Sequence, residues 1–78
     1  MKLSELAQGI QILSTYYDDP DGYHVAAEHD QIFLYATDRP LTAEDVTRML
    51  ALGWFQESGA TDDEPEAYDA EEGWQSFT

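Results

Sequence analysis

A run of acidic residues without a single base occupies much of the last third of this chain. Residues 57–72 contain eight carboxylates, and no Lys or Arg follows Arg48. Aromatic residues border the run, with Trp54 and Phe55 before it and residues 73–77 (GWQSF) after it. We therefore predict a long acidic loop joining two short aromatic strands. A loop of this length is uncommon in a compact domain and tends to be functional or mobile.

The charge balance of the whole chain excludes several classes of function. Its 78 residues include 17 Asp and Glu against 3 Lys and Arg, which gives a formal net charge of −14. A protein that binds nucleic acid by neutralising phosphates needs a basic face, so we expect no direct nucleic-acid binding. An anionic membrane surface would repel the chain, and no apolar run approaches the ~20 residues of a membrane span.

Composition also indicates the compartment and the number of domains. The chain has no cysteine, which excludes disulfides, thiolate metal sites and a cysteine nucleophile. The first residues, MKLSE, lack the continuous apolar segment of a secretory signal, so we expect a cytoplasmic protein. Hydrophobic residues make up 42% and aromatic residues 13% of the chain, whereas disordered chains are poor in aromatics. We predict one folded domain spanning residues 1–78.

Apolar side chains recur every three or four residues near the N-terminus, which predicts an amphipathic helix. The positions are Leu3, Leu6, Ile10, Leu13 and Tyr17. Gly9 lies inside this helix and weakens it by about 1 kcal/mol relative to alanine. The sequence DDPDG at residues 18–22 is a strong turn signal, so we expect the helix to end near Tyr16 and Tyr17.

Two β-forming runs follow the turn. Residues 23–28 alternate between apolar and polar side chains, and residues 31–36 contain a short apolar run. His29 and Asp30 separate the runs, which predicts a tight β-hairpin.

A second helix is predicted to follow. Thr42 is a good N-cap, and Glu44 and Asp45 place negative charge at the positive end of the helix dipole. Gly53 suits a left-handed helix terminator. With Trp54 and Phe55 pairing with residues 73–77, the expected fold is α+β, of order α-β-β-α-β-β, with a mainly antiparallel four-stranded sheet packed on two helices.

The residue pattern argues against a metal site and against an active site. Asp19, Asp21, Gly22 and Glu28 match part of a calcium-binding loop, but Tyr17 occupies the position of its first ligand. A polar turn is the better interpretation there. The two histidines are too few for a transition-metal site, and no serine has the context of a nucleophile. We therefore predict no enzyme, no metal site and no cofactor.

The chemistry that remains is binding to a basic partner. Tyr68 lies among acids without another large apolar residue nearby, so we expect it to be exposed as an interface anchor. The open alternative is that Tyr68 folds back onto the domain. The candidate partner-binding residues are Asp18, Asp19, Asp21, Glu57, Asp62, Asp63, Glu64, Glu66, Tyr68, Asp69, Glu71 and Glu72.

Such a density of carboxylates favours mimicry of nucleic acid. Duplex DNA carries one negative charge per ~1.7 Å of its axis. A small acidic domain can offer a comparable density and enter the Lys- and Arg-lined groove of a DNA-binding protein. Attraction would then be long-range and sensitive to salt.

Four runs of residues resemble small proteins encoded by bacteriophages and prophages. The runs are AEHDQI at 27–32, LTAEDV at 41–46, LGWF at 52–55 and GWQSF at 73–77. In size, charge and lack of catalytic residues the chain is similar to anti-CRISPR and anti-restriction inhibitors, several of which mimic DNA. The resemblance implies an inhibitor of a host defence complex, such as a CRISPR surveillance complex, that blocks its DNA-binding site.

Two other interpretations remain open from the sequence. In the first, the chain is a phage accessory or structural protein whose acids only confer solubility. In the second, it is a weak divalent-cation-binding protein whose acidic loop is ordered by the ion. The sequence does not decide whether the acids at 18–21 and those at 57–72 share one face.

Overall fold

A computed structural model describes residues 1–19 and 21–77 of the chain. Within these residues the chain forms two α-helices, one short 3₁₀ helix and a three-stranded antiparallel sheet of order β1-β2-β3. The elements are α1 (Leu3–Ser14), β1 (Val25–Glu28), β2 (Gln31–Leu34), α2 (Ala43–Ala51), η1 (Pro65–Ala67) and β3 (Trp74–Phe77). The fold class is therefore α+β, as predicted, and the order of helices and strands is α-β-β-α-β.

The predicted fourth strand is wrong. Phe55 makes one isolated bridge to Gln75, with backbone N–O distances of 2.9 Å in both directions. The chain then turns, because the Gln56 N–H donates to the carbonyl of Ala60 at 2.9 Å. This turn takes the backbone away from β3 after a single paired residue. Within the described residues the order α-β-β-α-β-β and the four-stranded sheet are thus replaced by a three-stranded sheet with one bridging residue at its edge.

The predicted hairpin is confirmed, with shorter strands than expected. Glu28 pairs with Gln31, so His29 and Asp30 form a two-residue turn. His29 has a φ of 53°, in the left-handed region that tight hairpin turns require. The strands span Val25–Glu28 and Gln31–Leu34.

The local signals around the second helix are also confirmed. The Asp45 N–H donates to Oγ1 of Thr42 at 3.2 Å, so Thr42 is the N-cap of α2. Gly53 has a φ of 94°, which a residue with a β-carbon rarely adopts. The chain reverses direction at Gly53, and the next residue, Trp54, packs against α1.

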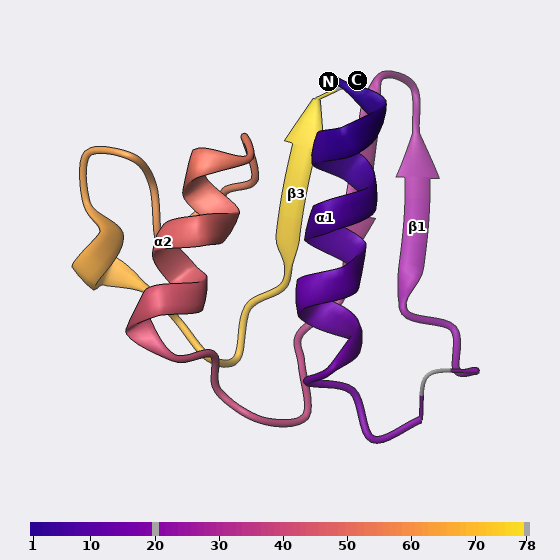
Figure 1. The fold of residues 1–78 in the computed structure, drawn as a ribbon, viewed down its shortest axis with the longest axis horizontal. Helices are drawn as coiled ribbons and strands as arrows, with labels where there is room; N and C mark the ends of the chain where they lie inside the picture. The colour runs from indigo at the N-terminus through magenta and orange to yellow at the C-terminus, as the bar shows by residue number, and fades with distance from the viewer. Residues whose placement is uncertain (20, 78) are drawn as a thin grey trace.

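The core lies between α1, α2 and one face of the sheet. Figure 1 shows α1 against one face of the sheet, running along the strand direction between β3 and β1, with α2 beside β3 on the side away from β1. Leu13, Leu34, Met49, Trp54 and Trp74 are among the buried side chains that meet there. In the described part of the chain, no helix is long and apolar enough to cross a membrane.

Gly9 has a packing role that its position in the helix does not reveal. Trp54 is 1% exposed, and its Nε1–H donates to the carbonyl of Glu5 at 3.4 Å. A β-carbon at Gly9 would overlap the indole nitrogen of Trp54. The missing side chain therefore lets the indole ring lie directly against α1.

Tyr17 remains buried although α1 ends at Ser14, two or three residues before the predicted end. Its ring stacks on His24 with centroids 4.0 Å apart, and its hydroxyl donates to the carbonyl of Tyr35 at 2.5 Å. Burial, and then the negative charge of Asp38, raise the pKa of Tyr17 to about 12.

This raised pKa predicts a loss of stability at alkaline pH. The unfolded state releases the Tyr17 proton near its ordinary pKa of 10.0, whereas the folded state retains it to about 12. The stabilisation is fully present below pH 10 and declines as pH rises toward 12. We expect the free energy of unfolding to fall by about 1 kcal/mol between pH 9 and pH 11 through this group. Urea unfolding of the native chain and of Tyr17→Phe measures this change, and an equal decline in both would contradict it.

Candidate partner-binding surface

The structure separates the predicted acidic residues other than Asp69 into three groups. The turn cluster is Asp18, Asp19 and Asp21, the tip cluster is Asp62, Asp63, Glu64 and Glu66, and the groove cluster is Glu57, Glu71 and Glu72. Figure 1 places the turn beside β1 and the segment around η1 at opposite ends of the longest axis. The turn and tip clusters therefore do not form one continuous face, which the sequence left undecided.

A buried glutamine fixes the path of the acidic segment. Gln56 is 0% exposed, and its Nε2 donates to the carbonyls of Asp69 and Glu72 at 2.8 and 3.0 Å. Its Oε1 accepts from the N–H groups of Ala60 and Asp69, both at 2.9 Å. One side chain thus joins the start, the middle and the end of the segment. Sequence reasoning missed Gln56, because nothing in its neighbours distinguishes it from a surface glutamine.

The tip cluster projects from a short turn that leads into η1. The Glu64 N–H lies 3.1 Å from the carbonyl and 3.2 Å from Oγ1 of Thr61, and the Ala67 N–H donates to the carbonyl of Glu64. All four side chains of the cluster are exposed. Among residues 1–19 and 21–77, no Lys or Arg forms an ion pair with them. The cluster therefore presents concentrated negative charge to solvent.

Tyr68 is not the exposed anchor that the sequence suggested. Its ring stacks on Trp74 with centroids 6.0 Å apart, and its hydroxyl accepts a hydrogen bond from the Leu41 N–H at 2.9 Å. The side chain is half-buried against the core. The exposed interpretation is wrong, and the alternative that Tyr68 folds back is confirmed. Tyr68 ties η1 to the domain and thereby positions the tip cluster.

The turn cluster is partly neutralised. Asp18 pairs with the guanidinium of Arg39, which also donates to the carbonyl of Thr15. The Asp21 N–H donates to Oδ1 of Asp19 at 3.0 Å, so one of these carboxylates serves the turn itself. The cluster thus offers less unpaired charge than the tip cluster. In the described residues, no three His, Asp or Glu side chains come together in an arrangement suited to a metal ion.

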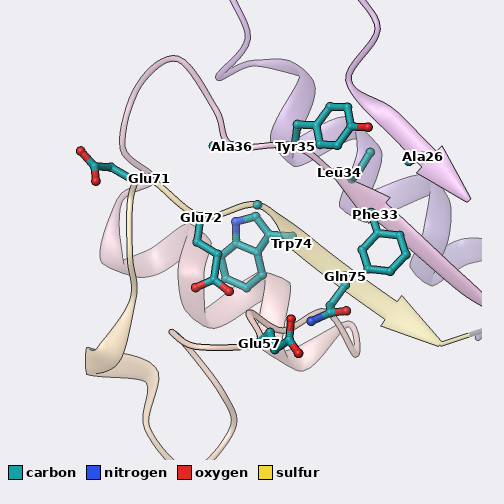
Figure 2. Close-up of a pocket in the computed structure, with 11 residues that line it drawn as sticks. Ala26, Phe33, Leu34, Tyr35, Ala36, Glu57, Glu71, Glu72, Trp74 and Gln75 are labelled. Atoms are coloured by element: carbon teal, nitrogen blue, oxygen red, sulfur yellow. The ribbon is translucent and has the colours of Figure 1, made fainter.

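The groove cluster borders the face of the sheet that α1 does not cover. The strand register places Ala26, Phe33 and Gln75 in one row across that face. A groove of about 530 Å³ lies there, lined by Glu57, Glu71 and Glu72 together with this row. Figure 2 shows these residues, with the carboxylate of Glu71 directed away from Trp74. Oε1 of Glu72 accepts a hydrogen bond from the Ser58 N–H at 2.9 Å. Asp69 is exposed nearby in the chain, and its Oδ1 accepts from the Glu71 N–H at 2.9 Å.

Comparisons with known proteins give no family for this chain. No protein-family model matches the sequence, and neither the curated proteins nor the solved structures contain a match.

Proposed function

We propose that this chain is a binding protein that inhibits a nucleic-acid-binding host defence complex by occupying its basic DNA-binding site. The observation that carries the proposal is the tip cluster, four exposed carboxylates on a segment whose path is fixed by Gln56 and Tyr68. The resemblance to phage-encoded anti-CRISPR and anti-restriction inhibitors supports a cytoplasmic role in the infected cell.

The distribution of the few bases supports the same proposal. Arg39 is engaged by Asp18, and Arg48 lies 3.4 Å from Asp45. Both arginines are therefore compensated within the domain, and the excess charge of −14 is left to the carboxylates. A partner lined with Lys and Arg is the complement of such a surface.

Fixing the carboxylates in advance also favours tight binding. A mobile acidic loop would lose conformational freedom on docking, which costs binding free energy. Gln56 contributes four hydrogen bonds to the folded segment before any partner arrives. The acids of the tip cluster then act together on one basic groove, where duplex DNA would otherwise place its phosphates.

Capture from a bacterial extract tests this function. The immobilised chain is exposed to a nuclease-treated lysate, and bound complexes are eluted with added salt or with duplex DNA. The eluted complex is then assayed for DNA binding in the presence and in the absence of the chain. We expect the chain to block DNA binding by the captured complex and to do so less well as salt increases. If nothing that binds DNA is captured, the phage accessory interpretation replaces the proposal.

Charge reversal locates the contact. Changing the tip cluster to lysine should raise the half-inhibitory concentration at least about tenfold, because several attractive contacts become repulsive. The four changes are Asp62→Lys, Asp63→Lys, Glu64→Lys and Glu66→Lys. A matched control with the same change in net charge carries Asp19→Lys, Asp21→Lys, Glu28→Lys and Glu44→Lys. Equal inhibition by the native chain and the tip variant would eliminate the acidic tip as the contact.

A further inference from the structure

We propose that the groove on the uncovered sheet face binds an extended protein segment carrying an arginine two residues away from an apolar side chain. This inference adds a second, partly apolar contact to the electrostatic one proposed above, and it uses different residues. The juxtaposition that carries it is an aromatic floor with three glutamates along its border.

Aromatic side chains supply the floor of the groove and continue beyond it on the same sheet face. Phe33 lies in the middle of the uncovered face, opposite Ala26 and Gln75 on the neighbouring strands. Tyr35 is 52% exposed, and Phe77 is 56% exposed. Exposed large apolar side chains gathered on one face of a sheet indicate an interaction surface.

The edge of the sheet extends this apolar face. Phe55 bridges to Gln75 from outside β3, and its ring lies 5.7 Å from that of Phe77. The register pairs Phe77 with Gln31, which lies two residues before Phe33 on β2. Side chains two residues apart on a strand point to the same face, so the rings of Phe77 and Phe55 lie on the same sheet face as Phe33 and the groove. The groove volume of about 530 Å³ falls in the range of known ligand pockets.

Charge complementarity identifies the occupant. Glu57, Glu71 and Glu72 border the groove, and none of its described lining residues is a Lys or Arg. A guanidinium can make bidentate hydrogen bonds to a carboxylate and also stack on an aromatic ring, whereas a lysine ammonium acts as a point charge. Arginine therefore fits the combination of glutamates and phenylalanine better than lysine does.

The shape of the surface favours an extended segment. Successive residues of an extended chain rise about 3.3 Å and point to opposite sides, so residues two apart can contact the same sheet face. One such side chain meets the glutamates while the other meets the phenylalanine floor. A second copy of this chain is a poorer occupant, because it would bring another net charge of −14 against the three glutamates.

Peptide titration of the isotope-labelled full chain tests the inference by NMR. The probe is a peptide of about six residues in which serine separates each arginine from the next leucine, so that arginine and leucine lie on the same side, and it spans ~20 Å when extended. We expect saturable shifts at the amides of Phe33, Glu72 and Gln75. An arginine–serine peptide of equal charge should bind at least about tenfold more weakly, because it lacks the apolar contact. Shifts confined to the tip cluster, or no saturation up to about 1 mM, would overturn the inference.

Paired variants separate this groove from the rest of the acidic surface. Glu57→Gln with Glu71→Gln should weaken peptide binding at least about tenfold, because two exposed carboxylates at the border of the groove become neutral. The control, Glu5→Gln with Glu44→Gln, changes the net charge equally outside both the groove and the tip cluster, and it should shift the affinity less than about twofold. Equal losses in both variants would show a non-specific charge effect and overturn the inference.

The same variants distinguish failure of the groove from failure of the proposed function. If the groove variant still inhibits the captured complex while the charge-reversed tip variant does not, and the peptide does not bind, the function stands without the groove. If the peptide binds as expected but DNA binding by the complex is never blocked, the groove stands without the DNA-mimic function. Amide shifts that depend on protein concentration without peptide would instead assign the face to a second copy of the chain.

Discussion

Replacing Gln56 with leucine is expected to lower the free energy of unfolding by about 3 kcal/mol or more. Leucine preserves most of the volume and removes four hydrogen bonds. Two N–H groups, those of Ala60 and Asp69, then lose their acceptor, and the carbonyls of Asp69 and Glu72 lose their donor. A buried polar group without a partner costs about 1–3 kcal/mol. The Ala60 N–H is buried, so water cannot replace its lost acceptor, and the loss of this one hydrogen bond already lowers the free energy of unfolding substantially.

Two measurements check the role of Gln56. Urea unfolding gives the change in stability, and hydrogen exchange gives its location, since the amides of Ala60 and Asp69 should lose protection first. Gln31→Leu is the matched control, because Gln31 makes a single side-chain bond of 3.2 Å to Gln75. It should cost less than about 1 kcal/mol. Unchanged protection at Ala60 and Asp69 in Gln56→Leu would show that the segment keeps its path without this side chain.

The elements that the sequence predicts correctly are those with local causes. The spacing of His29 and Asp30 between two β-forming runs, the side chain of Thr42 and the left-handed backbone of Gly53 each act within a few residues. Capping and turn chemistry depend on such short-range contacts. The hairpin and the second helix could therefore be predicted from neighbouring residues alone.

The errors arise where distant contacts decide the structure. Phe55 has the side chain of a strand residue, but its pairing ends after one residue, where the side chain of Gln56 binds the distant carbonyls of Asp69 and Glu72. Tyr68 has acidic neighbours in the sequence, yet Trp74 and Leu41 hold it against the domain. Neither contact leaves a signal in the local pattern, so the sequence alone overestimates the sheet and misplaces the tyrosine.

The candidate surface was likewise predictable only in the features that do not depend on distant contacts. The carboxylates of residues 57–72 are evident from composition, whereas their separation into a tip cluster and a groove cluster depends on the fold. Glu57 and Glu72 are 15 positions apart and line the same groove because Gln56 binds the carbonyl of Glu72. The aromatic floor could not be located from the sequence, since alternation within β2 and β3 does not reveal which face α1 covers.

Gly9→Ala is expected to destabilise the domain, although helix propensity alone predicts the opposite. Alanine improves an exposed helix interior by about 1 kcal/mol relative to glycine. At this position its methyl group would overlap the indole of Trp54, which is buried and cannot move away freely. Forcing extra volume into a packed core costs about 1–3 kcal/mol and occasionally more. Because the overlap here is with a fully enclosed ring, we expect the penalty to prevail, with a net loss of about 2 kcal/mol.

A double-mutant cycle isolates this contact. Trp54→Phe removes the indole nitrogen and leaves room beside α1, so adding Gly9→Ala in that background should cost much less or stabilise the helix. The expected coupling free energy between the two positions is about 2 kcal/mol. Denaturant unfolding of the four chains measures it. If Gly9→Ala raises stability by about 1 kcal/mol in both backgrounds, propensity alone governs this position and the glycine has no packing role.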